Sequence, residues 1–136
     1  MFDLQTRNST SVGGQDKPGL TVCLLDDDES VLKATGRLLR SAGWDVKAFT
    51  DPCAFLEYAR THSPKVVVID IWMPIMNGLE VQTKLRDVSP TTRVIVLTSK
   101  DDPSVRTKAI DAGATGFFLK PVDDDEFLAG VESASS

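Results

Sequence analysis

An uninterrupted apolar run, Val66–Ile69, ends directly in Asp70, and this junction constrains the fold most strongly. Such a run is too short for a buried helix and is typical of a strand buried on both faces of a parallel sheet. Pro74 and the pair Asn77-Gly78 then predict an ordered turn before a helical pattern begins. Ligands of open α/β sheets bind at the carboxyl ends of the strands, so Asp70 stands where a nucleophile or a metal ligand would lie. Taken alone, it could equally be an ordinary aspartate at a strand end.

Strand-like and helix-like segments alternate along the rest of the chain. The strand-like segments are expected at residues 20–25, 45–49, 66–69, 93–97 and 115–119. Helical spacing of apolar residues, with prolines at helix starts, predicts a helix after each strand. This alternation predicts an α/β fold, a parallel sheet with helices on both faces. Right-handed crossovers and a chain reversal beside the first strand give the flavodoxin-like (βα)5 order 2-1-3-4-5.

Length and composition restrict the class of protein. The 136 residues suit a single core, and the polar, aperiodic residues 1–19 predict a flexible tail before one domain at residues 20–136. The net charge of −5 argues against a general nucleic-acid binder. No segment resembles a signal peptide or a membrane span, so no membrane contact is expected. Cys23 and Cys53 lack metal-ligand spacing and suit reduced thiols in a cytoplasmic protein.

Charged and hydroxyl side chains follow four of the predicted strands at their carboxyl ends. These residues are Asp26, Asp27 and Asp28 after the first strand, Asp70 after the third, Thr98 after the fourth and Lys120 after the fifth. The four strands are neighbours in the predicted order, so the side chains should meet in one site. Clustered carboxylates that leave room for water suit Mg²⁺. A lysine and a hydroxyl beside the metal could hold phosphoryl oxygens, and the chemistry that fits is phosphoryl transfer onto a carboxylate.

Together these motifs resemble the receiver domain of response regulators in bacterial two-component signalling, over residues 20 to about 133. The matching stretches, in chain order, are Leu25-Asp26-Asp27, Asp70-x-x-Met73-Pro74-x-Met76-x-Gly78, Thr98 and Lys120-Pro121. Each is weak alone, but four in the correct order at the correct strand ends are specific. The resemblance implies a signalling module that takes a phosphoryl group from a sensor histidine kinase. It would catalyse its own phosphorylation and dephosphorylation, and is not expected to be an enzyme in the ordinary sense.

The resemblance implies a role for each residue that would touch the phosphoryl group. Asp70 is expected to be the phosphoacceptor, and Lys120 to pair with the acyl phosphate. Thr98 is expected to move and hydrogen-bond a phosphoryl oxygen. Phe117 stands at the aromatic switch position, and because it has no hydroxyl its switching would rest on packing alone.

The resemblance also implies a set of Mg²⁺ ligands. Asp27 is expected to bind directly, Asp26 through water, and Asp70 and the backbone carbonyl of Trp72 would complete the protein ligands. Three consecutive aspartates leave the register open, so Asp27 and Asp28 could be the working pair instead. Asp26 and Asp27 are preferred because they directly follow the apolar strand.

Two other functions compete with this interpretation. A haloacid-dehalogenase-type phosphatase also uses a strand-end aspartate with Mg²⁺, but it needs a second aspartate two residues later, where this chain has Trp72. The other alternative is a receiver-like domain that never accepts phosphate and acts by protein contact alone. The presence of Asp70, Thr98 and Lys120 argues against it.

Residues 78–82 and 97–120 look most like receivers of the FixJ type. That likeness implies a C-terminal helix-turn-helix domain that binds DNA and controls transcription. Too few residues follow Lys120 for such a domain, so we expect either a receiver from a larger regulator or a stand-alone one. Phosphorylation is expected to change the face made by the fourth helix, fifth strand and fifth helix. That face would then promote a homodimer.

Overall fold

The computed structural model describes residues 20–136, in which strands and helices alternate without exception. The predicted flexible tail at residues 1–19 lies outside the described residues. The elements are β1 (Thr21–Leu25), α1 (Glu29–Ser41), β2 (Asp45–Phe49), α2 (Pro52–His62), β3 (Val66–Ile69), α3 (Gly78–Val88), β4 (Arg93–Thr98), α4 (Pro103–Asp111), β5 (Gly116–Leu119) and α5 (Asp124–Ser135).

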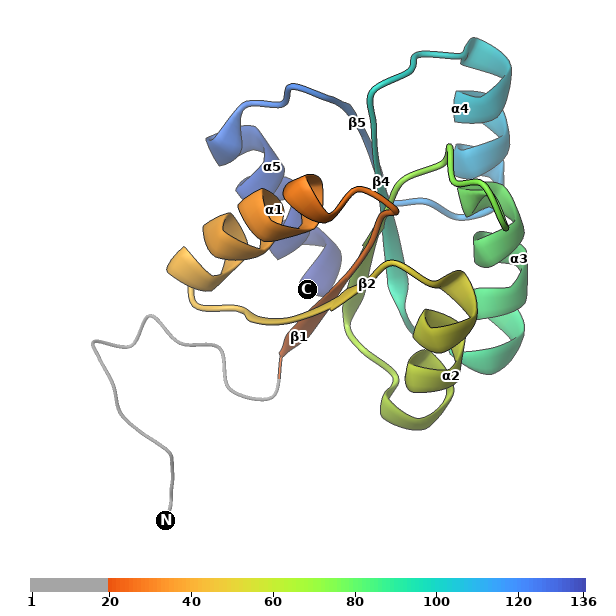
Figure 1. Cartoon of the computed structure of the whole chain (residues 1–136), viewed down its shortest axis with the longest axis horizontal. Coiled ribbons are helices and arrows are strands. Elements are labelled where there is room, and N and C mark those ends of the chain that lie inside the picture. The colour runs from red at the N-terminus through yellow and green to blue at the C-terminus, as the bar shows by residue number, and fades with distance from the viewer. Residues whose placement is uncertain (1–19) are drawn as a thin grey trace.

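The strands form one parallel sheet in the order β2-β1-β3-β4-β5, which confirms the predicted topology. Helices α1 and α5 cover one face of the sheet, and α2, α3 and α4 cover the other (Figure 1). Side chains alternate between the faces, because successive strand residues point to opposite sides. Val22 and Leu24 therefore pack under α1 and α5, whereas Cys23 and Leu25 pack under α2 and α3. Both faces are buried, as the apolar strand sequences indicated.

Side-chain caps start every helix soon after its strand ends. The N-caps of α1, α2, α4 and α5 are the aspartates Asp28, Asp51, Asp102 and Asp123, each of which accepts hydrogen bonds from backbone N–H groups of the first turn. Helix α3 begins with a capping box, in which Asn77 and Glu80 each accept a hydrogen bond from the other's backbone N–H group. The caps satisfy N–H groups that would otherwise be unpaired, so they keep the connections at this end of the sheet short.

Three strand boundaries differ by one residue from the predicted ones. β1 begins at Thr21, β5 begins at Gly116, and β4 extends to include Thr98. β4 is longer because the Thr98 carbonyl accepts a hydrogen bond from the Lys120 N–H group (2.8 Å), which continues the pairing with β5. Thr98 is therefore the last residue of β4 and does not lie in the loop after that strand.

The cysteines and the helices agree with two expectations from the sequence, namely unpaired thiols and no membrane span among the described residues. Both cysteines are free thiols: Cys53 is exposed, and burial raises the pKa of the Cys23 thiol to about 12, so it stays protonated. Within residues 20–136, no helix has the length and apolarity needed to cross a bilayer.

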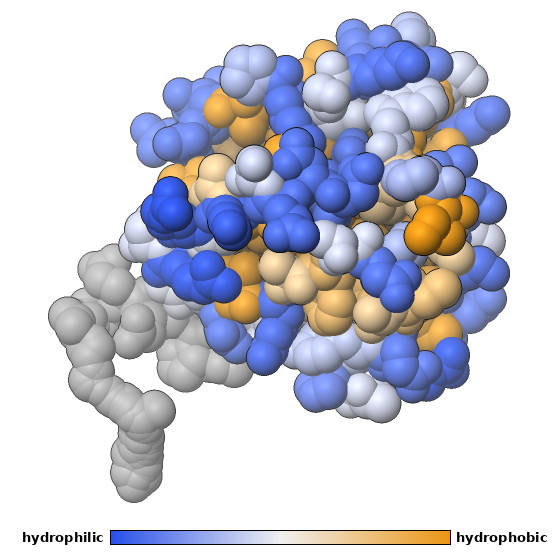
Figure 2. Space-filling view, viewed as in Figure 1, coloured by the Kyte–Doolittle hydropathy of each residue, from blue (hydrophilic) through white to orange (hydrophobic). Residues whose placement is uncertain are grey.

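The face of the molecule in Figure 2 is mostly hydrophilic, and apolar groups show there in small separate areas. The large apolar side chains exposed among these residues are Trp72, Ile75 and Ile110.

Candidate functional site

The pairing of β1 with β3 continues one residue past both strands and brings two aspartates together. Leu25 lies opposite Ile69, and the Asp70 N–H group donates to the Leu25 carbonyl (3.0 Å). Carboxylate oxygens of Asp26, Asp27 and Asp70 all lie within 4.8 Å of one another. Asp26 and Asp70 are buried, whereas Asp27 is exposed. The three carboxylates therefore form a compact acidic cluster, open to solvent on one side, at the carboxyl end of the sheet.

Lys120 reaches this cluster from β5 and pairs with its most buried carboxylate. The Lys120 ammonium donates to Asp26 Oδ2 (3.0 Å), and the Asp28 N–H group donates to Asp26 Oδ1 (2.9 Å). Burial raises the pKa of the Asp26 carboxyl above its ordinary value, although both of these donors lower it. The nearby charge of Asp70 adds to the rise. The ionised cluster is therefore short of positive charge, even with Lys120 in place.

Asp28, the third aspartate of the run, caps helix α1. Its Oδ1 atom accepts hydrogen bonds from the N–H groups of Ser30 (2.9 Å) and Val31 (3.4 Å), at the start of α1. A carboxylate at that place also suits the positive end of the helix dipole. The structure thus brings Asp26 and Asp27, and not Asp28, into the cluster with Asp70.

The loop after Asp70 is held by the close approach of Gly78. The Gly78 N–H group donates to the Ile71 carbonyl (2.9 Å). A Cβ atom at residue 78 would lie 2.8 Å from the backbone oxygen of Asp70 and 3.0 Å from Ile69 Cγ2 and Ile71 Cα. Only glycine fits there without a backbone shift. The packing fixes the position of Trp72, whose backbone carbonyl is an expected metal ligand.

Thr98 lies at the end of β4 with an unusual side chain. It is fully buried, and its Oγ1 atom has no hydrogen-bond partner among the described residues. A buried hydroxyl without a partner costs free energy, so this atom is available to a new polar group. Phe117, on β5, is half-buried against the core, with the Arg106 guanidinium 5.1 Å from its ring centroid. The two expected switch residues therefore occupy adjacent strands.

The family model for the response regulator receiver domain matches residues 22–132. This chain belongs to that family.

Relatives of this receiver domain are response regulators of greater length. Response regulator protein TodT of Pseudomonas putida is 34% identical over 113 residues, covering 83% of this chain and 50% of TodT. Tetrathionate response regulatory protein TtrR of Salmonella typhimurium is 37% identical over 114 residues, covering 84% of this chain and 55% of TtrR. The receiver chain thus spans about half the length of the curated relatives it matches.

Solved structures agree with the receiver fold. The crystal structure of FixJ-N superposes with a TM-score of 0.80 at 34% identity, covering 85% of this chain and 93% of that one. The chemotaxis protein CheY4 of Vibrio cholerae gives a TM-score of 0.78 at 26% identity, covering 85% of this chain and 98% of that one. The resemblance to FixJ-type receivers that the sequence indicated is confirmed.

Two contacts near the receiver site were not predicted. The Lys100 ammonium lies 4.6 Å from the ring centroid of Trp72, whose side chain is 39% exposed. No sequence pattern indicates this cation–π contact, because it joins the loops after β3 and β4. The capping box of Asn77 and Glu80 does have a signal, the spacing N-x-x-E before an apolar pattern.

We expect the Asp26→Asn variant to unfold at higher urea concentration than the wild type when no divalent metal is present. The raised pKa means that the folded state binds the Asp26 proton more tightly than the unfolded chain does. The ionised carboxylate is therefore destabilising at neutral pH, and the wild type regains stability as pH falls through the raised pKa. The difference between the two proteins should shrink on acidification. Urea denaturation in EDTA at neutral and acidic pH measures it, and a destabilised variant would contradict this interpretation.

Proposed function

We propose that this receiver domain accepts a phosphoryl group on Asp70 from a sensor histidine kinase, with Mg²⁺ held by the neighbouring carboxylates. The observation that supports this most directly is the cluster of Asp26, Asp27 and Asp70, which Lys120 joins through its ion pair with Asp26. Acidic groups gathered this closely repel one another unless cations balance them. A divalent metal bound among the carboxylates would complete that balance, and together with Lys120 it would offset the negative charge of a bound phosphoryl group.

The proposed reaction is an in-line transfer between two proteins. A carboxylate oxygen of Asp70 forms the new P–O bond, while the P–N bond of the kinase phosphohistidine breaks and the imidazole leaves with the electron pair. Mg²⁺ would neutralise charge on the phosphoryl oxygens. Lys120 would contact a second phosphoryl oxygen, and the unpaired Thr98 hydroxyl would donate to another.

The oxygen ligands at this site suit Mg²⁺ if Asp26 and Asp27 are the pair that binds it. Both Asp26 oxygens already accept hydrogen bonds within the protein, so Asp26 would act through a metal-bound water. The Asp27 carboxylate is exposed and accepts no hydrogen bond within residues 20–136, so it would bind directly. Asp70 and the Trp72 carbonyl would supply the remaining protein oxygens.

Mg²⁺ should change the fluorescence of Trp72, and we expect Asp27→Asn to weaken binding most. The measurement uses a Trp44→Phe background, because Trp44 is a second, buried indole. Asp28→Asn is the matched control, since asparagine is an equally good N-cap for α1 and should leave the affinity nearly unchanged. A larger loss in Asp28→Asn than in Asp27→Asn would place the working pair one residue later.

The direct test of the proposal is phosphorylation by a small donor. Acetyl phosphate and Mg²⁺ should add one phosphoryl group per chain, seen by intact mass. The group should be lost at alkaline pH, because an acyl phosphate hydrolyses there. EDTA should prevent the labelling. A chain that stays unmodified, although it is folded and supplied with Mg²⁺, would refute the function.

The output of the proposed signal would lie outside the described domain. The relatives are about twice as long as the match, and one of them is named as the transcriptional regulatory protein KdpE of Mycobacterium tuberculosis. We propose that a separate output domain, where present, controls transcription and makes any contact with DNA. A stand-alone receiver that acts by protein contact is the second candidate. Both act in the cytoplasm, where kinase catalytic domains and DNA are available.

The proposed phosphate signal would travel through Thr98 and Phe117. Movement of the Thr98 hydroxyl toward Asp70 would vacate space beside β5, into which the half-buried Phe117 ring could turn. Arg106 would then lose its contact with that ring, and the surface of α4, β5 and α5 would change. On this surface, Arg106 and Lys108 of α4 face solvent, as do Asp124 and Asp125 of α5.

We expect phosphorylation to promote a homodimer through this face. A two-fold axis would place the basic groups of α4 against the acidic groups of the partner's α5, with the exposed Ile110 adding apolar contact. Exposed ion pairs contribute only about 0–1 kcal/mol each, so several must act together. Sedimentation with and without beryllofluoride, a phosphoryl mimic, measures the effect. A dimer that survives charge reversal at Arg106 and Lys108 would place the interface elsewhere, and a monomer in both states would exclude it.

A further inference from the structure

The loops after β3 and β4 contact each other beside the acidic cluster. The Lys100 ammonium lies 4.6 Å from the ring centroid of Trp72, and the Trp72 N–H group donates to Asp70 Oδ1 (3.4 Å). Ile69 of β3 lies opposite Val96 of β4 in the parallel sheet, so both loops leave from the same end. The Lys100 ammonium is therefore held against the side chain of a residue whose backbone contacts the expected phosphoacceptor.

Lys100 has no partner other than this ring among the residues that the structure describes. Its side chain is exposed, and no carboxylate of residues 20–136 lies at ion-pair distance from it. An aromatic face holds a cation weakly at an exposed site, whereas a charge-assisted hydrogen bond to a phosphate oxygen is stronger. The ammonium can therefore exchange the ring for an anion that forms beside it.

The charge of the site favours a further cation once Asp70 is phosphorylated. Lys120 and a divalent metal together would match the charge of the three carboxylates before phosphorylation. A phosphoryl group carries about two negative charges at neutral pH, whereas the carboxylate that it modifies carries one. Phosphorylation therefore adds negative charge to a site already balanced, and it does so beside Trp72 and Lys100.

We propose that Lys100 is a second phosphoryl-binding cation, which rests on the Trp72 ring in the unphosphorylated domain and pairs with a phosphoryl oxygen after transfer. This inference rests on the proposed phosphorylation of Asp70. Thr98 precedes Lys100 by two residues, and the movement of its hydroxyl toward the phosphoryl group would draw the loop after β4 in the same direction. The flexible lysine stem lets the ammonium turn from the ring toward the phosphoryl group.

The position of the Lys100 ammonium can be followed by NMR with beryllofluoride as the probe. In the Mg²⁺-saturated chain without beryllofluoride, the ring current of the Trp72 indole should shift the Lys100 Hε signals upfield. Beryllofluoride should return them toward the values of an ordinary exposed lysine, because the ammonium leaves the ring. Hε signals that stay upfield in the beryllofluoride complex would overturn the proposal.

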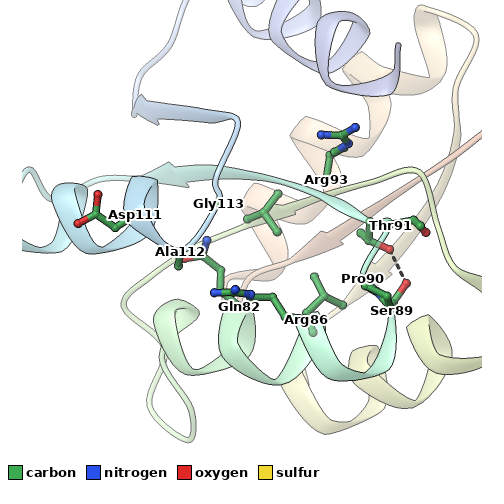
Figure 3. Close-up of a pocket in the computed structure, with 12 residues that line it drawn as sticks. Gln82, Arg86, Ser89, Pro90, Thr91, Arg93, Asp111, Ala112 and Gly113 are labelled. Carbon is green, nitrogen blue, oxygen red and sulfur yellow. Dashed lines mark hydrogen bonds between the residues drawn. The ribbon is translucent and has the colours of Figure 1, made fainter.

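Variants measure what the Lys100 contact contributes to binding. Lys100→Met keeps a side chain of similar length without the charge, and should weaken beryllofluoride binding about tenfold or more at saturating Mg²⁺. Lys100→Arg should restore most of the affinity. The matched control is Arg86→Met, which removes an exposed positive charge from the groove between α3, β4 and α4 (Figure 3). That groove lies at the opposite end of the sheet from Asp70, so the control should bind like the wild type.

The outcomes separate the role of Lys100 from the proposed function. Equal affinity of Lys100→Met and the wild type would overturn that role and leave the phosphorylation of Asp70 untouched. A loss of Mg²⁺ affinity as large as the loss of beryllofluoride affinity would show a disturbed loop, and would overturn the role as well. A wild-type chain that binds Mg²⁺ but no beryllofluoride would contradict the proposed phosphoacceptor, and the role of Lys100 with it.

Discussion

We expect the Asp70→Asn variant to gain no phosphoryl group under conditions in which the wild type gains one. The amide oxygen of asparagine is too weak a nucleophile to attack the phosphorus of the donor, whereas the wild-type residue is a buried carboxylate beside two other acids, one of which pairs with Lys120. Intact mass after incubation with acetyl phosphate and Mg²⁺ measures the difference. The effect should be a complete loss of the added mass, because one side chain forms the bond.

Asp51→Asn is the matched control for this experiment. Asp51 caps α2 through the Cys53 N–H group, and it takes no part in the carboxylate cluster. Asparagine serves equally well as an N-cap, so this variant should fold and become phosphorylated like the wild type. Labelling of Asp70→Asn to the wild-type level would show that another residue accepts the phosphoryl group.

The Gly78→Ala variant should lose about 1–3 kcal/mol of unfolding free energy, the usual cost of overpacking a tight contact. The added methyl group would lie 2.8 Å from the backbone oxygen of Asp70, so the clash is with the main chain and no side chain can move aside. The start of α3 must therefore shift away from the loop after β3. Urea denaturation measures the loss, and Mg²⁺ affinity should fall with it, because the loop holds the Trp72 carbonyl.

Gly36→Ala provides the opposite expectation at a second buried glycine. Its methyl group would meet only Arg40 Nη1 at 3.2 Å, the far end of a flexible side chain, and Leu24 Cδ1 at 3.8 Å. Alanine also favours the middle of a helix, so this variant should be neutral or gain up to about 1 kcal/mol. Equal stability of the Gly78 and Gly36 variants would show that the close approach at Asp70 does not constrain the loop.

The course of the chain could be predicted because its signals are local. Apolar runs, prolines at helix starts and glycines after helix ends each act over a few residues, and they indicated each strand to within one residue and a helix after each strand. Parallel pairing then follows from short right-handed connections. The same reasoning predicted that Asp26, Asp70, Thr98 and Lys120 lie at one end of the sheet, because residues that follow neighbouring parallel strands lie close together.

Only the tertiary structure decided what each side chain at that edge contacts. Three consecutive aspartates are alike in sequence, but backbone geometry turns Asp28 toward the N–H groups of α1 and leaves Asp27 in the cluster. The ion pair of Lys120 with Asp26 and the contact of Lys100 with Trp72 join loops far apart in the chain. Such contacts depend on strand register and loop shape to within an ångström, and local patterns hold no such distances.

The unpaired buried atoms show the same division. Thr98 and Gln82 look like ordinary polar residues in an apolar strand and an amphipathic helix, and their patterns predict burial or a helix face and nothing more. Packing removed water from both side chains and left Oγ1 and Oε1 without partners. The sequence by itself determined which residues lie at which end of the sheet, because periodicity and chain order control that. Which polar atoms remain unsatisfied was decided only when helices and strands packed, because satisfaction depends on every neighbour at once.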